Sequence, residues 1–241
     1  MSTVDGRIVV FRSEPGQGDA VLCSGGLDSV VLLADIVRRA DGARVVPVYV
    51  SVGLAWEPEE RAALERMLAE DAFRGAQPLE TLHFDMRDVY PSSHWAIKGE
   101  APGFDTPDED VYLEGRNVVL LTKAGVFMAR ARLSRVSIGP LAGNPFPDAT
   151  PDFFASMSHA LSIGLATPIE IAAPLLLQSK ADVIARGQSL GVPLELTLSC
   201  MQPSSGLHCG RCSKCRERKD AFREAGVEDR TIYQSERRTA P

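Results

Sequence analysis

The chain has 241 residues, 44% of them hydrophobic, with a formal net charge of -6 and a sequence pI near 5.3. This length supports one sizeable core and a small appended module, but it is short for two full domains. No apolar stretch reaches the roughly 20 residues of a membrane helix, and Met1–Arg12 lacks the regions of a signal peptide. The acidic balance disfavours a nucleic-acid partner. We therefore expect a cytoplasmic protein without membrane segments.

Short β-branched runs alternate along the chain with longer stretches of helical periodicity. In chain order the predicted strands are Arg7–Phe11 at an edge, Ala20–Cys23, Val45–Val52, Leu79–Phe84, Arg135–Gly139 and Ile169–Ala173. The predicted helices are Leu32–Ala40, Glu59–Phe73, Val118–Leu133, Phe153–Ile163 and Ala181–Leu190. Such alternation predicts βαβ units around a mainly parallel sheet, which is the α/β class.

One long segment interrupts this alternation. Tyr90–Asp110 is rich in proline and has little apolar periodicity, so we predict a surface loop there. Loops of this length within a compact domain are usually functional lids or disordered excursions. Within it, His94 and Trp95 are suited to closing over a flat base.

A glycine-rich turn follows the strand predicted at Ala20–Cys23 and leads into an apolar helix. Adjacent glycines let a phosphate approach the backbone, and the N–H groups at a helix start favour an anion. The turn is neither a Walker A motif nor a dinucleotide fingerprint, and a purely structural turn is the alternative. We predict that it binds the phosphates of ATP, with Asp28 either holding Mg²⁺ or capping the helix. The predicted ATP-binding residues are Leu22, Cys23, Ser24, Gly25, Gly26, Leu27, Asp28 and Ser29.

Four of the five cysteines are crowded near the C-terminus. In a chain without export signals this indicates a metal site rather than disulfides. Four thiolates complete a tetrahedral Zn²⁺ shell, which leaves no open position and makes the site structural. An iron–sulfur cluster is the alternative, although the spacing differs from that of bacterial ferredoxins. The predicted ligands are Cys200, Cys209, Cys212 and Cys215.

These features divide the chain into two parts. Residues 1–195 are predicted to form an ATP-binding α/β domain, and residues 196–241 a zinc-binding region packed on it. We expect the metal to tie a strand-like segment, Leu196–Leu198, to the helix that follows Lys214. Cys23, outside the cysteine set, is predicted to be a small core residue.

We call the glycine-rich turn Ser24–Ser29 the phosphate turn, and the four cysteines of the predicted metal site the cysteine set. In their order and separation, these two motifs resemble those of the 7-cyano-7-deazaguanine synthases, a PP-loop family. The resemblance covers most of the chain and extends to Glu114–Asn117, Phe146–Asp148, Ala173–Leu175, Ser179–Ala181 and Leu196–Cys200. It implies a PP-loop fold that uses ATP, Mg²⁺ and a structural Zn²⁺. The implied reaction converts 7-carboxy-7-deazaguanine and ammonia to 7-cyano-7-deazaguanine through an adenylated intermediate, in queuosine biosynthesis.

The resemblance also implies roles for individual residues. Asp28, Lys180 and Arg116 become the expected catalytic residues, the first on Mg²⁺ and the other two as cations beside phosphates or substrate. Arg116, Phe146 and Asp148 are the expected substrate residues, because a carboxylate can accept two parallel N–H bonds from a purine-like edge. The alternatives are a solvated lysine, a structural arginine and a turn aspartate.

Two stretches depart from the family pattern. Val52–Trp56 stands where members commonly carry Tyr-Gly-Gln-Arg-His, and Phe146–Thr150 stands where they commonly carry Tyr-Pro-Asp-Cys-Arg. These departures keep a second hypothesis open, a PP-loop ligase acting on a different acid, a protein or a tRNA. A thiolating enzyme is disfavoured, since only one cysteine remains outside the metal set. A non-enzymatic nucleotide sensor is the third alternative, and a homodimer is compatible with each.

Overall fold

The computed structural model describes residues 2–4, 7–9 and 18–237. At its centre lies a five-stranded sheet in the order β5-β4-β3-β6-β7, and all its neighbouring strands run parallel. The strands are β3 (Asp19–Leu22), β4 (Val45–Ser51), β5 (Glu80–His83), β6 (Arg135–Ser137) and β7 (Glu170–Ala172). The predicted α/β class with a parallel sheet is therefore confirmed.

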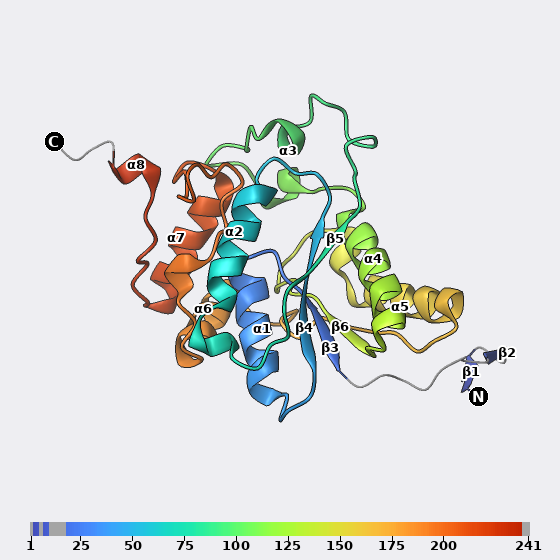
Figure 1. The fold of residues 1–241 in the computed structure, drawn as a ribbon. Helices are drawn as coiled ribbons and strands as arrows, with labels where there is room; N and C mark the ends of the chain where they lie inside the picture. The colour runs from blue at the N-terminus through green and yellow to red at the C-terminus, as the bar shows by residue number, and fades with distance from the viewer. Residues whose placement is uncertain (1, 5–6, 10–17, 238–241) are drawn as a thin grey trace.

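Helices cover both faces of the sheet (Figure 1). One face carries α1 (Leu27–Arg39), α2 (Glu57–Leu68), α6 (Lys180–Ser189) and α7 (Ser213–Ala225). The opposite face carries α4 (Arg116–Ala131) and α5 (Pro151–Leu165). The shorter helices are α3 (Trp95–Lys98), α8 (Gln234–Arg237) and the 3-10 turns η1 (Asp71–Phe73), η2 (Asp108–Val111), η3 (Pro147–Ala149) and η4 (Leu194–Leu196).

The core consists of two apolar clusters, one on each face of the sheet. Ala20 and Leu22 of β3 belong to the cluster that includes the buried residues of α4 and α5. Val21 and Cys23 belong to the cluster formed with α1, α6 and α7. Successive strand side chains point to opposite faces, so a strand covered on both sides needs an unbroken apolar run. The burial of Cys23 confirms its prediction as a core residue.

Most predicted elements lie within two residues of the observed ones, but α1 and α2 do not. The helix predicted to end at Phe73 ends at Leu68, and Asp71–Phe73 forms the separate 3-10 turn η1. Helix α1 begins at Leu27, five positions before the predicted start at Leu32, because its polar first turn belongs to the helix as well. The predicted edge strand Arg7–Phe11 is also corrected. Arg7–Val9 (β2) pairs antiparallel with Ser2–Val4 (β1) in a separate two-stranded sheet, while positions 10 and 11 lie outside the described residues.

The strand expected at Leu196–Leu198 is likewise corrected. The chain there forms the turn η4, closed by a 2.6 Å hydrogen bond from the Thr197 hydroxyl to the Leu194 carbonyl. The backbone N–H of Leu198 then donates to the carbonyl of Gly25 at 2.8 Å. This segment therefore braces the phosphate turn instead of extending a sheet.

The long loop lies over the carboxyl-terminal end of the sheet (Figure 1). It is more ordered than expected, since it contains α3 and most of η2 and buries Tyr90 and Ala96. The guanidinium of Arg216 on α7 donates to the carbonyl of Phe104 at 2.6 Å and to that of Thr106 at 3.2 Å. These bonds fasten the loop to the C-terminal region and place it as a cover.

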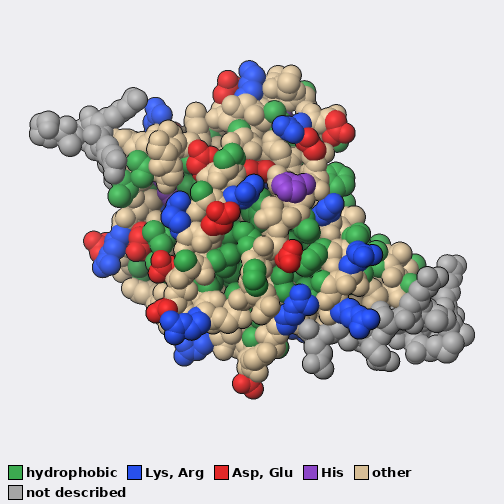
Figure 2. Space-filling model, viewed as in Figure 1, with side chains coloured by type: hydrophobic (Ala, Val, Ile, Leu, Met, Phe, Trp, Pro, Cys, Tyr) green, Lys and Arg blue, Asp and Glu red, His purple; other side chains and the backbone are tan. Residues whose placement is uncertain are grey.

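The surface in Figure 2 carries acidic and basic side chains interspersed over the whole face, with hydrophobic ones between them. Mixed charge of this kind is usual for a protein surface. Within the described part of the chain, none of the helices has both the length and the hydropathy that a bilayer crossing requires.

Candidate functional site

The strand order creates a crevice at the carboxyl ends of β3 and β6. The chain leaves β3 for α1 on one face and leaves β6 for α5 on the other, so the two loops diverge there. Open parallel sheets bind their ligands at such a point. A cavity of about 240 Å³ lies here, lined by the phosphate turn, β4, α2, the start of α4 and the loop after β6.

The phosphate turn is held in shape by its own serines. The backbone N–H of Ser24 donates to the Ser29 hydroxyl at 3.2 Å, and this hydroxyl donates to the Gly26 carbonyl at 2.9 Å. Gly26 precedes the first residue of α1 and has no side chain to occupy the helix start. The turn therefore offers backbone N–H groups at the positive end of a helix dipole, which suits an anion.

Gly25 cannot be replaced without strain. Its φ of +78° is left-handed, and a Cβ atom there would lie 2.8 Å from the carbonyl oxygen of Glu60. We expect Gly25→Ala to lower the melting temperature by several degrees more than Gly191→Ala. Both variants incur the left-handed backbone strain of about 1–2 kcal/mol, but Gly191 at φ +73° has open space around it. Thermal unfolding of the two variants measures the difference, and equal Tm values would contradict the tight packing of the turn.

A chain of alternating charges runs from the phosphate turn to α7. Lys180 Nζ lies 3.0 Å from Asp28 Oδ2 and 2.6 Å from Glu217 Oε1, and Lys214 Nζ lies 2.7 Å from Glu217 Oε2. Burial lowers the pKa of Lys180, but Asp28 and Glu217 outweigh it, so the net pKa is raised. Burial raises the pKa of Glu217, yet the two lysines bring it down to about 2. Lys180 is therefore a cation, and Glu217 an anion, at neutral pH.

Asp28 contributes one oxygen to this chain and keeps the other free. Its Oδ1 is buried and has no hydrogen-bond partner among the described residues. Because the carboxylate faces Lys180, the alternative in which Asp28 caps α1 is not what the structure shows. A buried, unpaired carboxylate oxygen beside an anion site is suited to a divalent cation.

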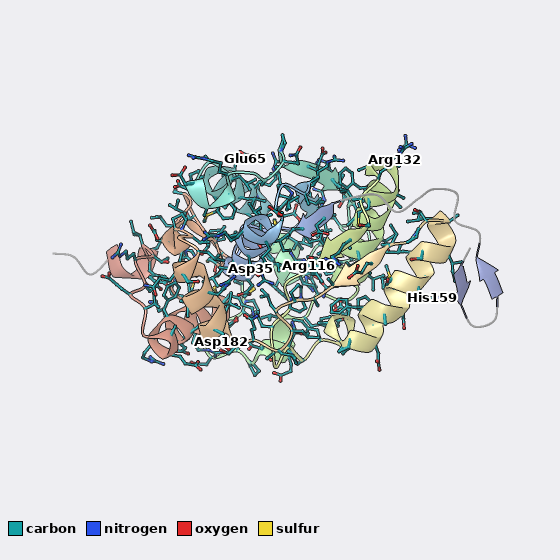
Figure 3. The ribbon with its side chains drawn as sticks, turned by 90° about the horizontal axis from the view of Figure 1, so that it is seen from below. Asp35, Glu65, Arg116, Arg132, His159 and Asp182 are labelled. Atoms are coloured by element: carbon teal, nitrogen blue, oxygen red, sulfur yellow. The ribbon has the colours of Figure 1, made fainter. Side chains whose placement is uncertain are left out.

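The three expected substrate residues lie at the start of α4 and in the loop after β6. Arg116 is the first residue of α4 and lies near the middle of the molecule, whereas Arg132, at the other end of that helix, lies at the edge of the molecule (Figure 3). The Nε of Arg116 is buried and has no partner within the described residues. Phe146 stacks on Tyr112 with ring centroids 4.9 Å apart. Both Arg116 and Phe146 line the cavity.

Asp148 is differently placed. Its carboxylate accepts from the backbone N–H of Asn117 at 3.0 Å and from the Asn117 side chain at 3.3 Å, outside the cavity lining. Burial raises the pKa of Asp148, although the bonds from Asn117 oppose the shift. The carboxylate thus holds the start of α4 in place, and its contact with substrate stays a prediction.

A second cavity of about 240 Å³ adjoins the first under the long loop. Its walls include Trp56 and Trp95, whose rings stack 5.6 Å apart at an interplanar angle of 10°. The cavities share six lining residues: Ser24, Gly26, Asp28, Glu60, Arg116 and Phe146. A ligand in one cavity and a ligand in the other would therefore meet at this shared wall.

Sequence reasoning missed Glu60 in this wall. Its carboxylate accepts from the Tyr49 hydroxyl and from the Trp56 indole N–H, both at 3.1 Å. The helical period could have indicated that Glu60 is buried, because Glu57, Glu60 and Met67 lie on the same buried face of α2. Three glutamates near the helix start could equally have been first-turn charges that favour the dipole.

The four C-terminal cysteines come together as predicted. They are all buried, and their sulfur atoms lie within 4.8 Å of one another. Separations of 3.9 Å (Cys200 to Cys212 and Cys209 to Cys215) and 3.5 Å (Cys212 to Cys215) surround one central point. Backbone N–H groups donate to the sulfurs of Cys200 and Cys209. The cluster could hold one metal ion.

Comparison with known proteins yields a family match. Residues 19–226 match the family described as "Queuosine biosynthesis protein QueC". The 7-cyano-7-deazaguanine synthase of Methanothrix thermoacetophila is 34% identical over 225 residues, which cover 88% of this chain and 97% of that protein. The synthase of Solidesulfovibrio magneticus is 34% identical over 246 residues, covering 92% and 98%. The resemblance drawn from the motifs is confirmed.

Solved structures share the general arrangement at low identity. The U34-tRNA thiolase NcsA from Methanococcus maripaludis with its [4Fe-4S] cluster is 12% identical, with a TM-score of 0.49 over 92% of this chain and 75% of that one. The NMN synthetase from Francisella tularensis is 14% identical, with a TM-score of 0.43 over 89% and 79%. Scores this low carry no argument about function.

Proposed function

We propose a function on the premise that this chain belongs to the family of the queuosine biosynthesis protein QueC. The proposed reaction is the ATP-dependent conversion of 7-carboxy-7-deazaguanine and ammonia to 7-cyano-7-deazaguanine. One structural observation supports this reaction in addition to the names of the relatives. A phosphate turn, an unpaired arginine nitrogen and an aromatic-walled cavity meet along a single shared wall.

The chemistry explains why these parts are needed together. A carboxylate is a poor electrophile, and with ammonia at neutral pH it forms only a salt. When its oxygen attacks the α-phosphorus of ATP, pyrophosphate leaves and an acyl adenylate forms. Ammonia displaces AMP to give the amide. A second activation, at the amide oxygen, followed by loss of AMP gives the nitrile. The protein contributes positioning and charge neutralisation, without a covalent nucleophile.

The two cavities suggest how the reactants divide the site. The nucleotide would occupy the first cavity with its phosphates on the turn, beside the Lys180 cation. The flat heterocycle of the acid would lie in the second cavity against Trp95 and Phe146, with its carboxylate toward Arg116. Asp28 Oδ1 would hold Mg²⁺, which supplies charge neutralisation on the phosphates when bound.

For the cysteine cluster we propose zinc. A tetrahedral ion with Zn–S bonds of about 2.3 Å separates its sulfurs by roughly 3.8 Å, and the observed separations of 3.5 and 3.9 Å fit this shell. An iron–sulfur cluster between the same four sulfurs would hold them farther apart. Four thiolates leave no coordination site for water, so the ion would stabilise the fold and would not take part in catalysis.

A ligase for a different acid is the second candidate. Trp56 lines the second cavity and lies within one of the two stretches that depart from the family pattern. A different residue in the wall of the second cavity would allow a different acid to bind there. Amide formation that stops before the nitrile would belong to this candidate.

A direct assay separates the candidates. The purified protein is incubated with ATP, Mg²⁺, ammonium and 7-carboxy-7-deazaguanine, and product masses are followed over time. We expect AMP and pyrophosphate together with the nitrile, and no product when ATP is omitted. Amide as the end product would favour the second candidate. Absence of any acid-dependent AMP formation would contradict the proposed function.

A further inference from the structure

The route from ammonia to a nitrile requires a proton acceptor in the site. A nitrile nitrogen carries no hydrogen, so all three N–H bonds of ammonia must break during the two half-reactions. Neither the phosphate turn nor the cations beside it can accept these protons. A group with basic character must therefore face the reacting carbon at the boundary between nucleotide and acid.

Glu60 occupies this boundary. It projects from the first turns of α2 into the wall that both cavities share, together with Asp28 and Arg116. Its side chain is anchored by the Tyr49 hydroxyl from β4 and the Trp56 indole from the start of α2. Glu60 is 8% exposed and lines both cavities, so its carboxyl group is shielded from bulk water.

The neighbouring carboxylates are less suited to the task. Asp28 is paired with Lys180, and Glu217 is held between Lys180 and Lys214. An adjacent cation stabilises a carboxylate and weakens it as a base. The hydrogen bonds to Glu60 come from uncharged donors, and although the charge of Arg116 lowers the pKa of Glu60, burial raises it by more, so its basicity is better preserved.

We propose that Glu60 is the catalytic base that removes protons from the nitrogen, a role that rests on the proposed function. In the first half-reaction ammonia forms the C–N bond as the C–O bond to AMP breaks, and one N–H proton passes to the carboxylate. In the second, the amide oxygen displaces pyrophosphate from ATP, the carboxylate removes one N–H proton to leave a neutral imidate, and it removes the last N–H proton as the C–O bond to AMP breaks. The carboxyl group returns each proton to solvent between steps.

The groups around Glu60 tune it to neutral pH. Burial raises its pKa to about 7, opposed by Arg116 on α4 and by the hydrogen bond from Tyr49, and reinforced by Glu57 on its own helix. Asp28 of α1 faces the same second cavity. A base is most effective when its pKa lies near the working pH. With free ammonia held constant, amide formation should therefore rise with pH through about 7.

Glu60→Gln tests the proposal, because glutamine keeps the shape, its oxygen can accept from the Trp56 indole N–H, and its NH₂ group can donate to the Tyr49 hydroxyl. Acid-dependent ATP–pyrophosphate exchange without ammonium reports adenylation, and amide formation with ammonium reports the nitrogen step. We expect exchange within about threefold of wild type and amide formation lowered by about 10²- to 10⁴-fold. The rise with pH should disappear in the variant. Glu60→Asp, which keeps a carboxylate, should recover part of the rate.

Glu57→Gln is the matched control, one helical turn away on the same buried face. Its carboxylate accepts from the Ser51 hydroxyl at 2.6 Å and from the N–H groups of Val52 and Gly53 at 2.8 and 3.0 Å, outside both cavities. This variant should lose stability and keep the rise of amide formation with pH, displaced to slightly lower pH because Glu57 no longer raises the pKa of Glu60.

The outcomes are distinguishable. Equal loss of exchange and amide formation in Glu60→Gln would indicate a structural role and overturn the proposal, as would an unchanged amide rate. If the variant does not fold, the wild-type pH profile still tests the proposal. A rate of amide formation that does not change with pH through about 7 would exclude Glu60 as the base. A wild-type protein without acid-dependent exchange would instead remove the proposed function, and the role of Glu60 with it.

Discussion

Lys180→Met is expected to lower kcat by about 10²- to 10³-fold, the usual effect of removing a preorganised charge from an active site. Lys180 is the one lysine in the ion-pair chain that contacts Asp28 in the phosphate turn, at 3.0 Å. Methionine removes the charge that would stabilise developing negative charge on the phosphates. It also leaves the half-buried Asp28 without its cation, which adds repulsion toward the same phosphates. Steady-state release of AMP at saturating ATP and acid measures the change.

Arg186→Met provides the matched control. Arg186 lies on the same helix, α6, and its guanidinium pairs with Asp35 on α1, so it joins the same two helices as the Lys180 pair. The Arg186 pair lies outside both cavities. We expect this variant to lower the melting temperature slightly and to leave kcat unchanged. If Lys180→Met keeps kcat within about threefold of wild type, Lys180 has no role in the chemistry.

Cys212→Ser is expected to abolish stoichiometric metal binding and to lower Tm by about 10 °C or more. Structural zinc contributes on the order of 10 kcal/mol in small peptides, comparable to the whole net stability of a domain, and each kcal/mol shifts Tm by about 2–4 °C at this chain length. Cys212 lies immediately before α7, so its loss releases the helix that anchors the long loop. Metal analysis and thermal unfolding, with and without chelator, measure both effects.

Cys23→Ala controls for the loss of a buried thiol. Cys23 is 4% exposed in the core between the sheet and α1 and lies outside the cysteine cluster. It should lose stability through a small cavity and keep one metal ion per chain. Iron in place of zinc in the purified protein would overturn the proposed identity of the ion. Full metal occupancy in Cys212→Ser would overturn the four-ligand shell.

A consequence for activity follows from the path between the metal cluster and the phosphate turn. Leu198, two residues before the first cysteine, donates its N–H to the carbonyl of Gly25. Arg218 of α7 is fully buried and donates to the Thr197 hydroxyl at 2.8 Å and to the Leu194 carbonyl at 2.8 Å. Metal loss should therefore also loosen the phosphate turn, and nucleotide affinity should fall together with stability.

The class of fold, the order of the main elements, the glycine-rich turn after β3 and the four metal-ligand candidates could be predicted from local sequence patterns. Each of these is encoded in a local pattern: a strand or helix period, a glycine pair after an apolar run, or a cysteine spacing. The pairing of Asp28 with Lys180 lay beyond such patterns, because the two residues are brought together only when α6 packs beside α1. The pairing of Arg7–Val9 in a separate two-stranded sheet could not be predicted either, since an alternating run does not indicate which strand it pairs with.

Which polar groups share the site depends on how distant segments pack together. Glu57 and Glu60 lie on one face of α2, and packing turned the first toward a backbone turn and the second toward both cavities. The carboxylate of Asp148 accepts from the backbone N–H at the start of α4, a contact that the local sequence did not indicate, and its role at the substrate stays a prediction. The physical reason is common to these cases. A buried charge is stable only where partners from distant segments meet it, and local sequence carries no record of that meeting.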